Sequence, residues 1–317
     1  HSLKNTAVLG YLAQCNGHFF SMISDAKSHL IYQTRLTRIT PSRFEITSTS
    51  SSVRLHPAIP GEPRADAHEF RSIVGALHYA AHCVRPEIAA PISLLSKYLT
   101  DPTVTHLKQA RHILQYLMAT KTMGLTYRLD HTQTIDASRN IHLKPNILTG
   151  FSDATWADDP ANRRSQSGYA FMLNGAAVSW SSHQQQQVSN SSSEAEFRAY
   201  NDAAREALFL RKLEFDFNRA QSSNRPPTTI YNDNESAIKW LKNPCHHNKT
   251  KHIDAATLSV REHVSEFKTL TVSYCTTQLT VADVMTKALA KIKHWRHTRI
   301  LLGLQPEQQL QPQSEGG

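Results

Sequence analysis

Four acidic residues that lie far apart in the sequence each stand where a predicted strand ends or a predicted helix begins. They are Asp153, Glu196, Asp233 and Asp283. Carboxylates from separate elements that converge on one point can hold two Mg²⁺ ions about 4 Å apart, and such ions clamp the attacking and leaving oxygens of a phosphodiester. Mg²⁺ prefers oxygen ligands and keeps part of its water shell. The four acids together predict metal-dependent phosphodiester chemistry, which none of them predicts alone.

Each of these acids also has a purely structural explanation. Asp153 and Asp233 follow short apolar strands, where an aspartate commonly forms a turn or caps the next helix. Glu196 and Asp283 each stand three residues after a Ser or Thr, which is the spacing of a capping box. Singly, the structural explanations are favoured. Two strands that both end in an acid, however, match the edge where open α/β sheets place their ligand sites.

Glu194 competes with Glu196 for the role of the second acid, because both stand at the start of the same predicted helix. Residues two apart on a helix point in different directions, so only one of them can face the sheet edge. The residue pattern does not choose between them.

Two other polar clusters have weaker claims to chemistry. Asp158-Asp159, after Trp156, resembles the aspartate pair of polymerase palms but lacks the hydrophobic hairpin that surrounds such a pair, so we predict a polar loop. Cys245-His246-His247 with His252 fits no zinc-binding spacing, and a surface loop is the better interpretation.

The elements that must position the four acids follow from hydrophobic periodicity. Apolar residues at helical spacing predict three amphipathic helices between residues 65 and 120. Beyond residue 145 the pattern changes to mixed α/β in the order βββαβαβα, with a hairpin turn at Asn174-Gly175. The predicted elements are strands Ile147–Asp153, Gly168–Leu173 and Ala176–Ser182, helix Ser193–Phe217, strand Thr228–Asn232, helix Asn234–Leu241, strand Thr269–Cys275 and helix Leu279–Leu289.

Composition bounds the partners and the compartment. The net charge of +9 and the pI near 9.4 favour an acidic partner, most simply nucleic acid. Four cysteines without CxxC spacing indicate a reducing compartment. With no secretory signal and no apolar stretch of about 18 residues, we expect an intracellular protein, in cytoplasm or nucleus, that is neither secreted nor bound to a membrane. Because the chain begins with His1, we also expect it to be part of a longer one.

The chain resembles the end of the Pol polyprotein of copia-type retrotransposons. Seven phrases carry the resemblance in order: Phe151-Ser-Asp-Ala-Thr-Trp-Ala, Arg163-Arg-Ser-Gln-Ser-Gly-Tyr, Val178-Ser-Trp-Ser-Ser, Ser192-Ser-Glu-Ala-Glu-Phe, Tyr231-Asn-Asp-Asn-Glu-Ser-Ala-Ile, Lys249-Thr-Lys-His-Ile-Asp and Ala282-Asp-Val-Met-Thr-Lys. Upstream, Phe70-Arg-Ser-Ile-Val-Gly-Ala-Leu-His-Tyr and Arg85-Pro-Glu-Ile-Ala look like the segment that follows the polymerase palm in this family.

The resemblance implies an α/β fold with an RNase H-like mixed five-stranded sheet and flanking helices, preceded by a small helical, thumb-like connection. The implied domains are a degenerate reverse-transcriptase remnant and linker over 1–64, the connection over 65–130, the RNase H-like domain over 145–304 and a disordered tail over 305–317. The implied activity is hydrolysis of the RNA strand of RNA–DNA hybrids, in the context of the rest of the retroelement polyprotein.

The resemblance also assigns residues. It implies that Asp153, Glu196, Asp233 and Asp283 bind two Mg²⁺ ions, with Mn²⁺ as an alternative, and it prefers Glu196 to Glu194. We expect the nucleic acid to contact six further side chains, whose plainer interpretation is a solvated surface: Arg163, Arg164, Asn234, Lys249, Lys251 and His252.

Departures from the family keep alternatives open. Thr155 stands where family members usually have a second Asp, and the polymerase fingers and palm are missing, so polymerisation is not expected. One alternative is an inactive retroelement remnant that keeps the fold and binds nucleic acid. An integrase-type nuclease ranks lower, because its acids would run Asp, Asp, Glu.

Overall fold

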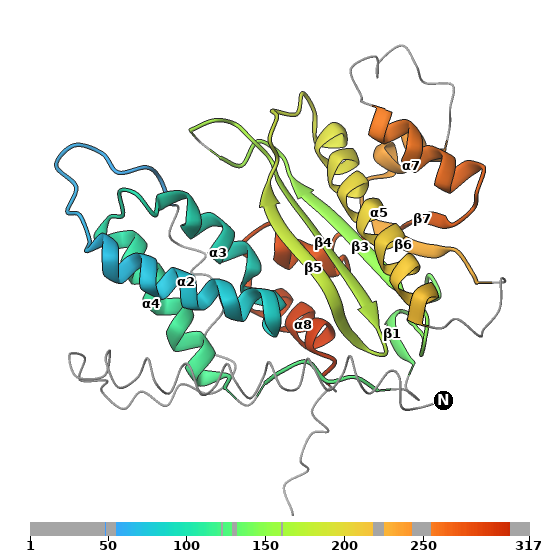
Figure 1. Cartoon of the computed structure of the whole chain (residues 1–317), viewed down its shortest axis with the longest axis horizontal. Helices are drawn as coiled ribbons and strands as arrows, with labels where there is room; N and C mark the ends of the chain where they lie inside the picture. Colours follow the sequence, from blue (N-terminus) through green and yellow to red (C-terminus); the bar gives the residue numbers. More distant parts are fainter. Residues whose placement is uncertain are drawn as a thin grey trace, which may run out of the picture.

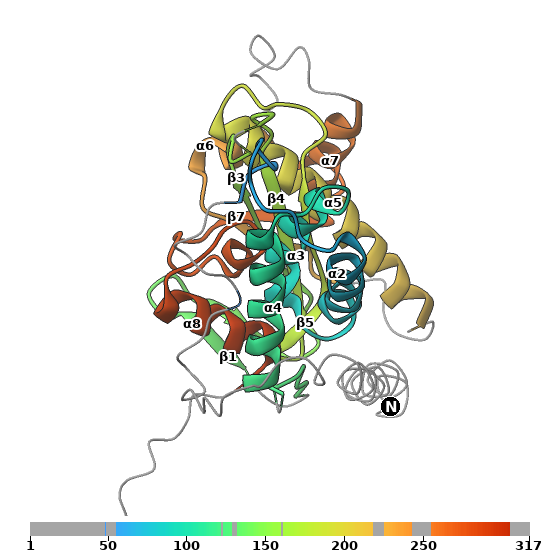
Figure 2. The same ribbon diagram turned by 90° about the vertical axis from the view of Figure 1, so that its left-hand side faces the viewer.

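The computed structural model describes residue 48 and residues 55–121, 123–128, 132–159, 161–217, 225–242 and 255–304, with only the backbone for 217 and 255–259. Helices from the first half of the chain lie beside a twisted sheet that carries helices on both of its faces (Figures 1 and 2). The predicted contacts Lys249, Lys251 and His252, most of the 1–64 segment and the 305–317 tail lie outside the described residues.

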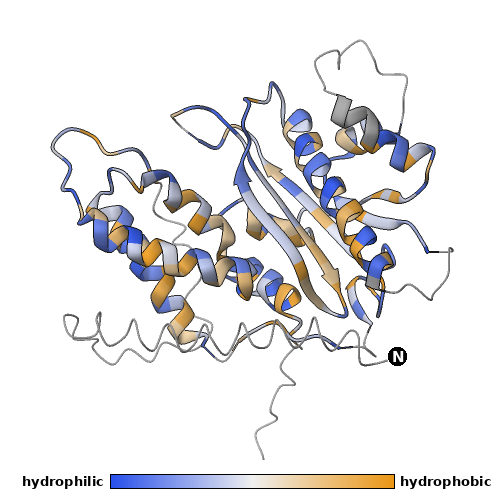
Figure 3. Cartoon of the chain, in the orientation of Figure 1, coloured by the Kyte–Doolittle hydropathy of each residue, from blue (hydrophilic) through white to orange (hydrophobic). Residues whose placement is uncertain are grey.

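Three helical segments precede the sheet, as predicted. Helix α2 (Ala67–Cys83) begins at Asp66, whose carboxylate accepts hydrogen bonds from the amides of the first turn. Helix α4 (Val104–Ala119) begins with a capping box made by Thr103. Their apolar faces pack together into one core, and Figure 3 shows hydrophobic and hydrophilic stretches alternating along these helices.

The second predicted helix is three shorter pieces: η1 (Pro86–Ile88), α3 (Ala89–Leu95) and η2 (Ser96–Tyr98). Pro91 explains the first break. A proline has no N–H and its ring clashes with the preceding turn, so it is tolerated only in the first turn of an α-helix. Starting α3 at Ala89 puts Pro91 in that turn.

The sheet has five strands in the order β5-β4-β3-β6-β7, with β3 antiparallel to β4, β4 antiparallel to β5, and β3, β6 and β7 parallel. This confirms the predicted RNase H-like mixed sheet. Asn174 and Gly175 both have positive φ angles, 52° and 86°, as the predicted tight hairpin turn requires. The strands are β3 (Thr149–Thr155), β4 (Gln166–Leu173), β5 (Ala176–Gln184), β6 (Thr228–Asn232) and β7 (Leu270–Tyr274).

Helices cover both faces of this sheet. Helix α5 (Ser192–Phe217), α6 (Glu235–Lys242) and α7 (Ala255–Ser265) lie on one face and share a core with it. The opposite face is covered by the short hairpin β1–β2, the 3₁₀ helix η4 and helix α8. These last elements are β1 (Gln133–Asp136), β2 (Ile141–Leu143), η4 (Val281–Met285) and α8 (Lys291–Leu302).

The region after β7 differs most from the sequence-based prediction. A helix over Leu279–Leu289 is predicted, but only the 3₁₀ helix η4 forms there. All five residues of η4 are buried. The segment is therefore enclosed on every side, unlike a surface helix, which buries only one apolar stripe. Hairpin β1–β2 and helices α7 and α8 are not predicted from the sequence at all.

Gly168 lets η4 approach the sheet closely. In strand β4 it pairs with Asp153, and a Cβ added to it would lie 2.5 Å from Cβ of Met285 and 2.8 Å from Cγ2 of Thr286.

We therefore expect Gly168→Ala to push η4 away and to lower the free energy of unfolding by about 1–3 kcal/mol, as measured by urea denaturation. Gly75→Ala, on the exposed side of α2 with open space around it, should instead raise stability by about 0.5–1 kcal/mol. Equal effects of the two changes would contradict the close approach.

Two buried histidines on α8 predict an acid-sensitive fold. Burial lowers the pKa of His294 to about 4 and that of His297 to about 3. Below pH about 6.5 the unfolded chain takes up a proton that folded His297 cannot, so stability present above that pH is lost as the pH falls. Replacing His297 by Leu removes this loss.

The measurement compares urea unfolding at pH 7.5 and 5.5. Relative to the parent, His297→Leu should gain about 1.4 kcal/mol for each pH unit below 6.5. His68→Leu, at an exposed position of α2, is the control and should change the pH profile little. Parallel profiles for parent and His297→Leu would show that His297 is not held neutral.

Candidate metal site at the end of the sheet

Strands β3 and β6 bring the first and third predicted acids side by side. The two strands are parallel, and the last pair of residues in their register is Phe151 with Tyr231. Asp153 and Asp233 each lie two residues further along, at the carboxyl ends of the strands, where open α/β sheets bind ligands. The backbone pairing alone therefore places these two carboxylates at the same edge.

Asp283 reaches the same point from the other direction. Strand β7 pairs with β6, and the chain then turns into η4, which contacts β3 and β4 beneath the edge. One carboxylate oxygen from each of Asp153, Asp233 and Asp283 lies within 4.8 Å of the other two. Asp153 and Asp283 are buried and Asp233 is half-buried. Three of the four predicted acids thus meet in space, each from a different element.

Two lysines and a threonine compensate the buried negative charge. Lys287 Nζ lies 2.7 Å from Asp283 Oδ1 and 3.5 Å from Asp153 Oδ2. Lys293, on α8, forms an ion pair with the other oxygen of Asp283, and the Thr286 hydroxyl donates a hydrogen bond to Asp153 Oδ2. The two ammonium groups therefore offset part of the negative charge of Asp153 and Asp283.

The protonation of Asp153 reflects this crowding. The pKa of Asp153 is raised to about 7, and burial is the largest cause. The nearby carboxylates of Asp283 and Asp233 add to the rise, whereas Lys287 and the Thr286 hydrogen bond oppose it. Although burial lowers the pKa of Lys287, the carboxylates of Asp153 and Asp283 outweigh it, so that this pKa is raised and the ammonium stays charged. A further cation would favour ionised Asp153 in the same way.

Glu196 adjoins the three aspartates without joining their group. Asn232 Nδ2 donates to Glu196 Oε2 over 3.0 Å and to the backbone oxygen of Ser152 over 3.2 Å, which ties α5 to the ends of β3 and β6. Burial, followed by the charge of Asp153, raises the pKa of Glu196 to about 9. Glu196 is therefore a buried carboxyl whose charge a bound cation would stabilise.

Glu194 faces elsewhere. Its carboxylate accepts hydrogen bonds from the backbone and side-chain nitrogens of Asn190 and pairs with Arg198 over 2.9 Å, while its own amide donates to Ser191 Oγ. The carboxylate of Glu194 is thus used in hydrogen bonds and an ion pair at the start of α5. For Asp283 the capping explanation is wrong, because Thr280 makes no side-chain capping bond and its hydroxyl donates to the backbone oxygen of Thr276.

The donor set fits a divalent cation. Carboxylate oxygens are the ligands that Mg²⁺ and Mn²⁺ prefer, and such sites keep some coordination positions for water or substrate. The half-buried Asp233 leaves the group accessible from one side, and the raised pKa of Asp153 means that this carboxyl gains from a positive neighbour.

Of the predicted nucleic-acid contacts, three lie within the described residues. Arg163 and Arg164 are exposed in the loop after β3, where Arg163 has a positive φ angle of 57°. That loop is the polar one predicted around Asp159, which pairs with Lys97 over 3.0 Å. Asn234 instead caps helix α6, because its side-chain oxygen accepts a hydrogen bond from the backbone N–H of Ala237.

Sequence reasoning missed the groups that hold the acids in place. Asn232, Thr286 and Lys287 are all present in the phrases that carry the resemblance, and their adjacency to acids was a usable signal. Lys293 could be found only by predicting α8. The spacing of buried Trp295, Thr298 and Leu302, followed by Gly303 in the left-handed conformation, was the available indication of that helix.

Comparison with known proteins points to one family. No protein-family model matches the chain. It is 33% identical over 224 residues to the retrovirus-related Pol polyprotein from transposon TNT 1-94 of Nicotiana tabacum, which covers 71% of this chain and 15% of that polyprotein. It is 40% identical over 141 residues to secreted RxLR effector protein 161 of Plasmopara viticola, which covers 44% of this chain and 90% of that protein.

Among solved structures, the chain is similar to LC11-RNase H1, isolated from compost by a metagenomic approach. The similarity covers 44% of this chain and 93% of that one, at 14% identity and a TM-score of 0.32. Within the described ranges, no helix combines the length and the apolar character needed to cross a bilayer.

Removing one lysine tests whether cations balance the buried acids. Lys287→Met leaves Asp153 and Asp283 with less positive charge, and without divalent ions we expect it to lower the free energy of unfolding by about 1–3 kcal/mol. Added Mg²⁺ should stabilise this variant more than the parent, because the ion replaces the missing charge. Thermal unfolding with and without Mg²⁺ measures both effects.

Lys239→Met is the matched control. Its exposed pair with Glu235, at 3.6 Å, should contribute little to stability. If Mg²⁺ stabilises the parent, Lys287→Met and Lys239→Met by the same amount, Lys287 does not compete with a cation for these carboxylates.

Proposed function

The chain belongs to the Pol polyproteins of copia-type retrotransposons, and we propose that it acts within such a polyprotein as an RNase H-type endonuclease, cutting the RNA strand of RNA–DNA hybrids. The convergence of Asp153, Asp233 and Asp283 to within 4.8 Å at the carboxyl edge of an RNase H-like sheet is the observation that carries the proposal. The chain spans about 15% of the TNT 1-94 polyprotein, so the hybrid and the rest of the polyprotein are both proposed partners. An intracellular site of action is part of the proposal.

The three aspartates would hold divalent cations, two Mg²⁺ ions or Mn²⁺ in their place, with Glu196 beside them. Such ions, when bound, activate water and stabilise the leaving oxygen of a phosphodiester. Neighbouring side chains orient the carboxylates that would bind the metal: Thr286 and Lys287 hold Asp153, and Asn232 holds Glu196. Asp233 is the aspartate that stays half-buried, which favours it as the one nearest to the substrate.

Substrate binding would rest on charge and on shape. The net charge of +9 favours salt-sensitive attraction to a phosphate backbone, and the exposed Arg163 and Arg164 stand in the loop that follows β3. Lys249, Lys251 and His252 would add to this attraction. Discrimination of RNA from DNA would come from the 2′-hydroxyl groups and from the form of the hybrid helix. Polymerase activity is not expected.

A second candidate function is a remnant that binds the hybrid without cutting it. Thr155 favours this candidate, because it replaces a second Asp that family members usually carry, and its hydroxyl is used to donate to the backbone oxygen of Thr286. All four predicted acids are present, which favours an active site.

One variant separates the two candidates. Asp233→Asn keeps the size of the side chain and removes its charge, so we expect the fold to remain and cleavage of a labelled RNA–DNA hybrid in Mg²⁺ to fall by about a thousandfold or more. Asp216→Asn, at the exposed end of α5, is the control and should cut at the parental rate. An Asp233→Asn protein as active as the parent would exclude this residue from the site, and a parent that binds hybrid but does not cut it would support the remnant.

A further inference from the structure

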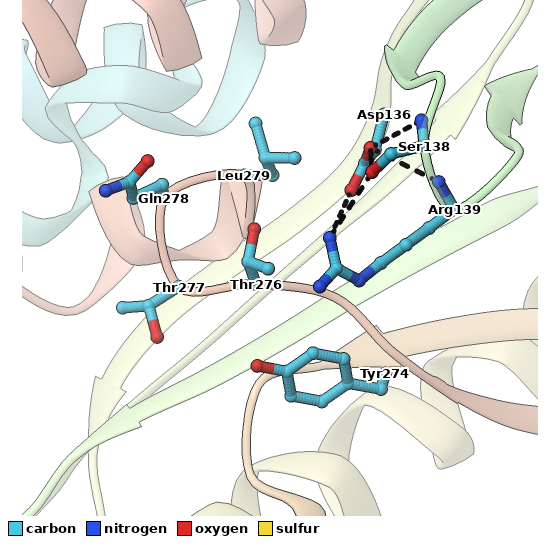
Figure 4. A pocket seen from close by; sticks show the side chains of 8 residues that line it. All are labelled: Asp136, Ser138, Arg139, Tyr274, Thr276, Thr277, Gln278 and Leu279. Atoms are coloured by element: carbon cyan, nitrogen blue, oxygen red, sulfur yellow. Dashed lines mark hydrogen bonds and ion pairs between the residues drawn. The ribbon is translucent and has the colours of Figure 1, made fainter.

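A hollow of about 590 Å³ lies beside the group of acids and has no role in the function proposed above. One wall is the turn of hairpin β1–β2, with Asp136, Ser138 and Arg139, and the other is the end of β7 with the loop that follows it, from Tyr274 onward. Figure 4 shows Arg139 and Tyr274 approaching each other from these two walls. Its volume is within the range of pockets that take a small organic ligand.

Two connections link the hollow to the candidate metal site, one through the backbone and one through a lysine. Tyr274 pairs with Asn232 in the sheet, and Asn232 immediately precedes Asp233. Neighbouring strands lie about 4.8 Å apart. Lys293 links the two places, because its ammonium group donates to the backbone oxygen of Thr277 over 2.7 Å and also pairs with Asp283. A strand held at the acids can therefore reach the hollow with its next few nucleotides.

The lining suits a flat ring. Tyr274 is 37% exposed, and the guanidinium carbon of Arg139 lies 5.8 Å from the centre of its ring. Aromatic rings and guanidinium groups are the surfaces on which unpaired bases stack, and such stacking tolerates any base because every base has a π face. Thr277 and Gln278 add hydroxyl and amide groups for hydrogen bonds at the rim.

The charge of the lining disfavours a bare phosphate. Asp136 pairs with Arg139 over 3.1 Å and accepts hydrogen bonds from the hydroxyl and the amide of Ser138. The hydrogen bond from the Ser138 hydroxyl, ahead of those from Arg139, lowers the pKa of Asp136, so this carboxylate stays charged and offsets the guanidinium. A near-neutral pocket that contains a partly exposed aromatic ring is better matched to a base than to an anion.

We propose that this hollow binds an unpaired nucleobase of a nucleic-acid strand that passes the acidic group, stacked on Tyr274 and flanked by Arg139. The inference rests on the proposed function for the presence of a strand at the acids. Bases inside the hybrid are paired and stacked, so the base that enters must come from a single-stranded extension or a frayed end. The chain should then bind a hybrid with an overhang more tightly than a blunt one.

The test measures the dissociation constants of fluorescently labelled hybrids by anisotropy in EDTA, where no metal-dependent cutting occurs. The probes are a blunt RNA–DNA hybrid and the same hybrid with a four-nucleotide extension on either end of either strand. The parent should bind one of the extended hybrids about tenfold more tightly than the blunt one. Tyr274→Ala should lose that advantage and bind the blunt hybrid as the parent does, whereas Tyr274→Phe should keep it.

Phe267→Ala is the matched control, because it removes an exposed aromatic ring just before the opposite end of β7. It should keep the overhang advantage, and circular dichroism should show that all three variants are folded. An equal loss on blunt and extended hybrids, or a parent without any overhang preference, would overturn the proposal. Hybrid cleavage by the parent in Mg²⁺ is assayed separately: an overhang advantage without cleavage would refute the nuclease alone, and cleavage without the advantage would refute the pocket alone.

Discussion

The balance of charge around two buried carboxylates governs this end of the molecule. Asp153 and Asp283 are almost fully shielded from water and close to each other, an arrangement that burial and mutual repulsion both oppose. The ammonium groups of Lys287 and Lys293 offset the cost. The tight contact of η4 with Gly168, the shielded Thr286 hydroxyl and the position of α8 all serve to keep these charges together.

Helix α8 connects that charge balance to the rest of the chain. Lys293 reaches Asp283, while Trp295 packs into the core formed by α2, α3 and α4. The neighbouring His294 lies with its Nε2 2.7 Å from Ser48 Oγ, close to the buried Arg85–Glu87 pair. The upstream helices therefore support the element that carries a lysine to the acids.

The strands, α5 and the hairpin turn were predictable because their apolar residues follow simple periods and because Asn-Gly marks a tight turn. The proximity of Asp153 and Asp233 was predictable, since β3 and β6 are parallel neighbours that lead to these two acids at one edge. Helix α8 was not predicted, because its inner face carries His294 and His297 while Ile292 is 87% exposed, the reverse of an amphipathic pattern, which outweighs the signal from Gly303 at its end. Without α8, the role of Lys293 could not be inferred.

The second acid shows the limit of pattern reasoning. By residue pattern alone Glu194 and Glu196 have equal claims, and the packing separates them: Glu194 binds Asn190 and Arg198 at the start of α5, whereas Glu196 is buried against Asn232. A periodicity states which residues share a face but not which neighbour that face will meet. The same holds for Tyr274 and Arg139, which come from distant segments and meet only because hairpin β1–β2 folds back over the end of β7.

The most direct test of the charge balance is a crystal grown with Mn²⁺ and examined by anomalous diffraction. We expect an anomalous peak that places a Mn²⁺ ion within bonding distance of carboxylate oxygens of Asp153, Asp233 and Asp283. The ammonium group of Lys287 or Lys293 should then be displaced from its carboxylate. A structure in which Mn²⁺ binds elsewhere, while both lysines keep their ion pairs, would contradict the assignment of these acids as a cation site.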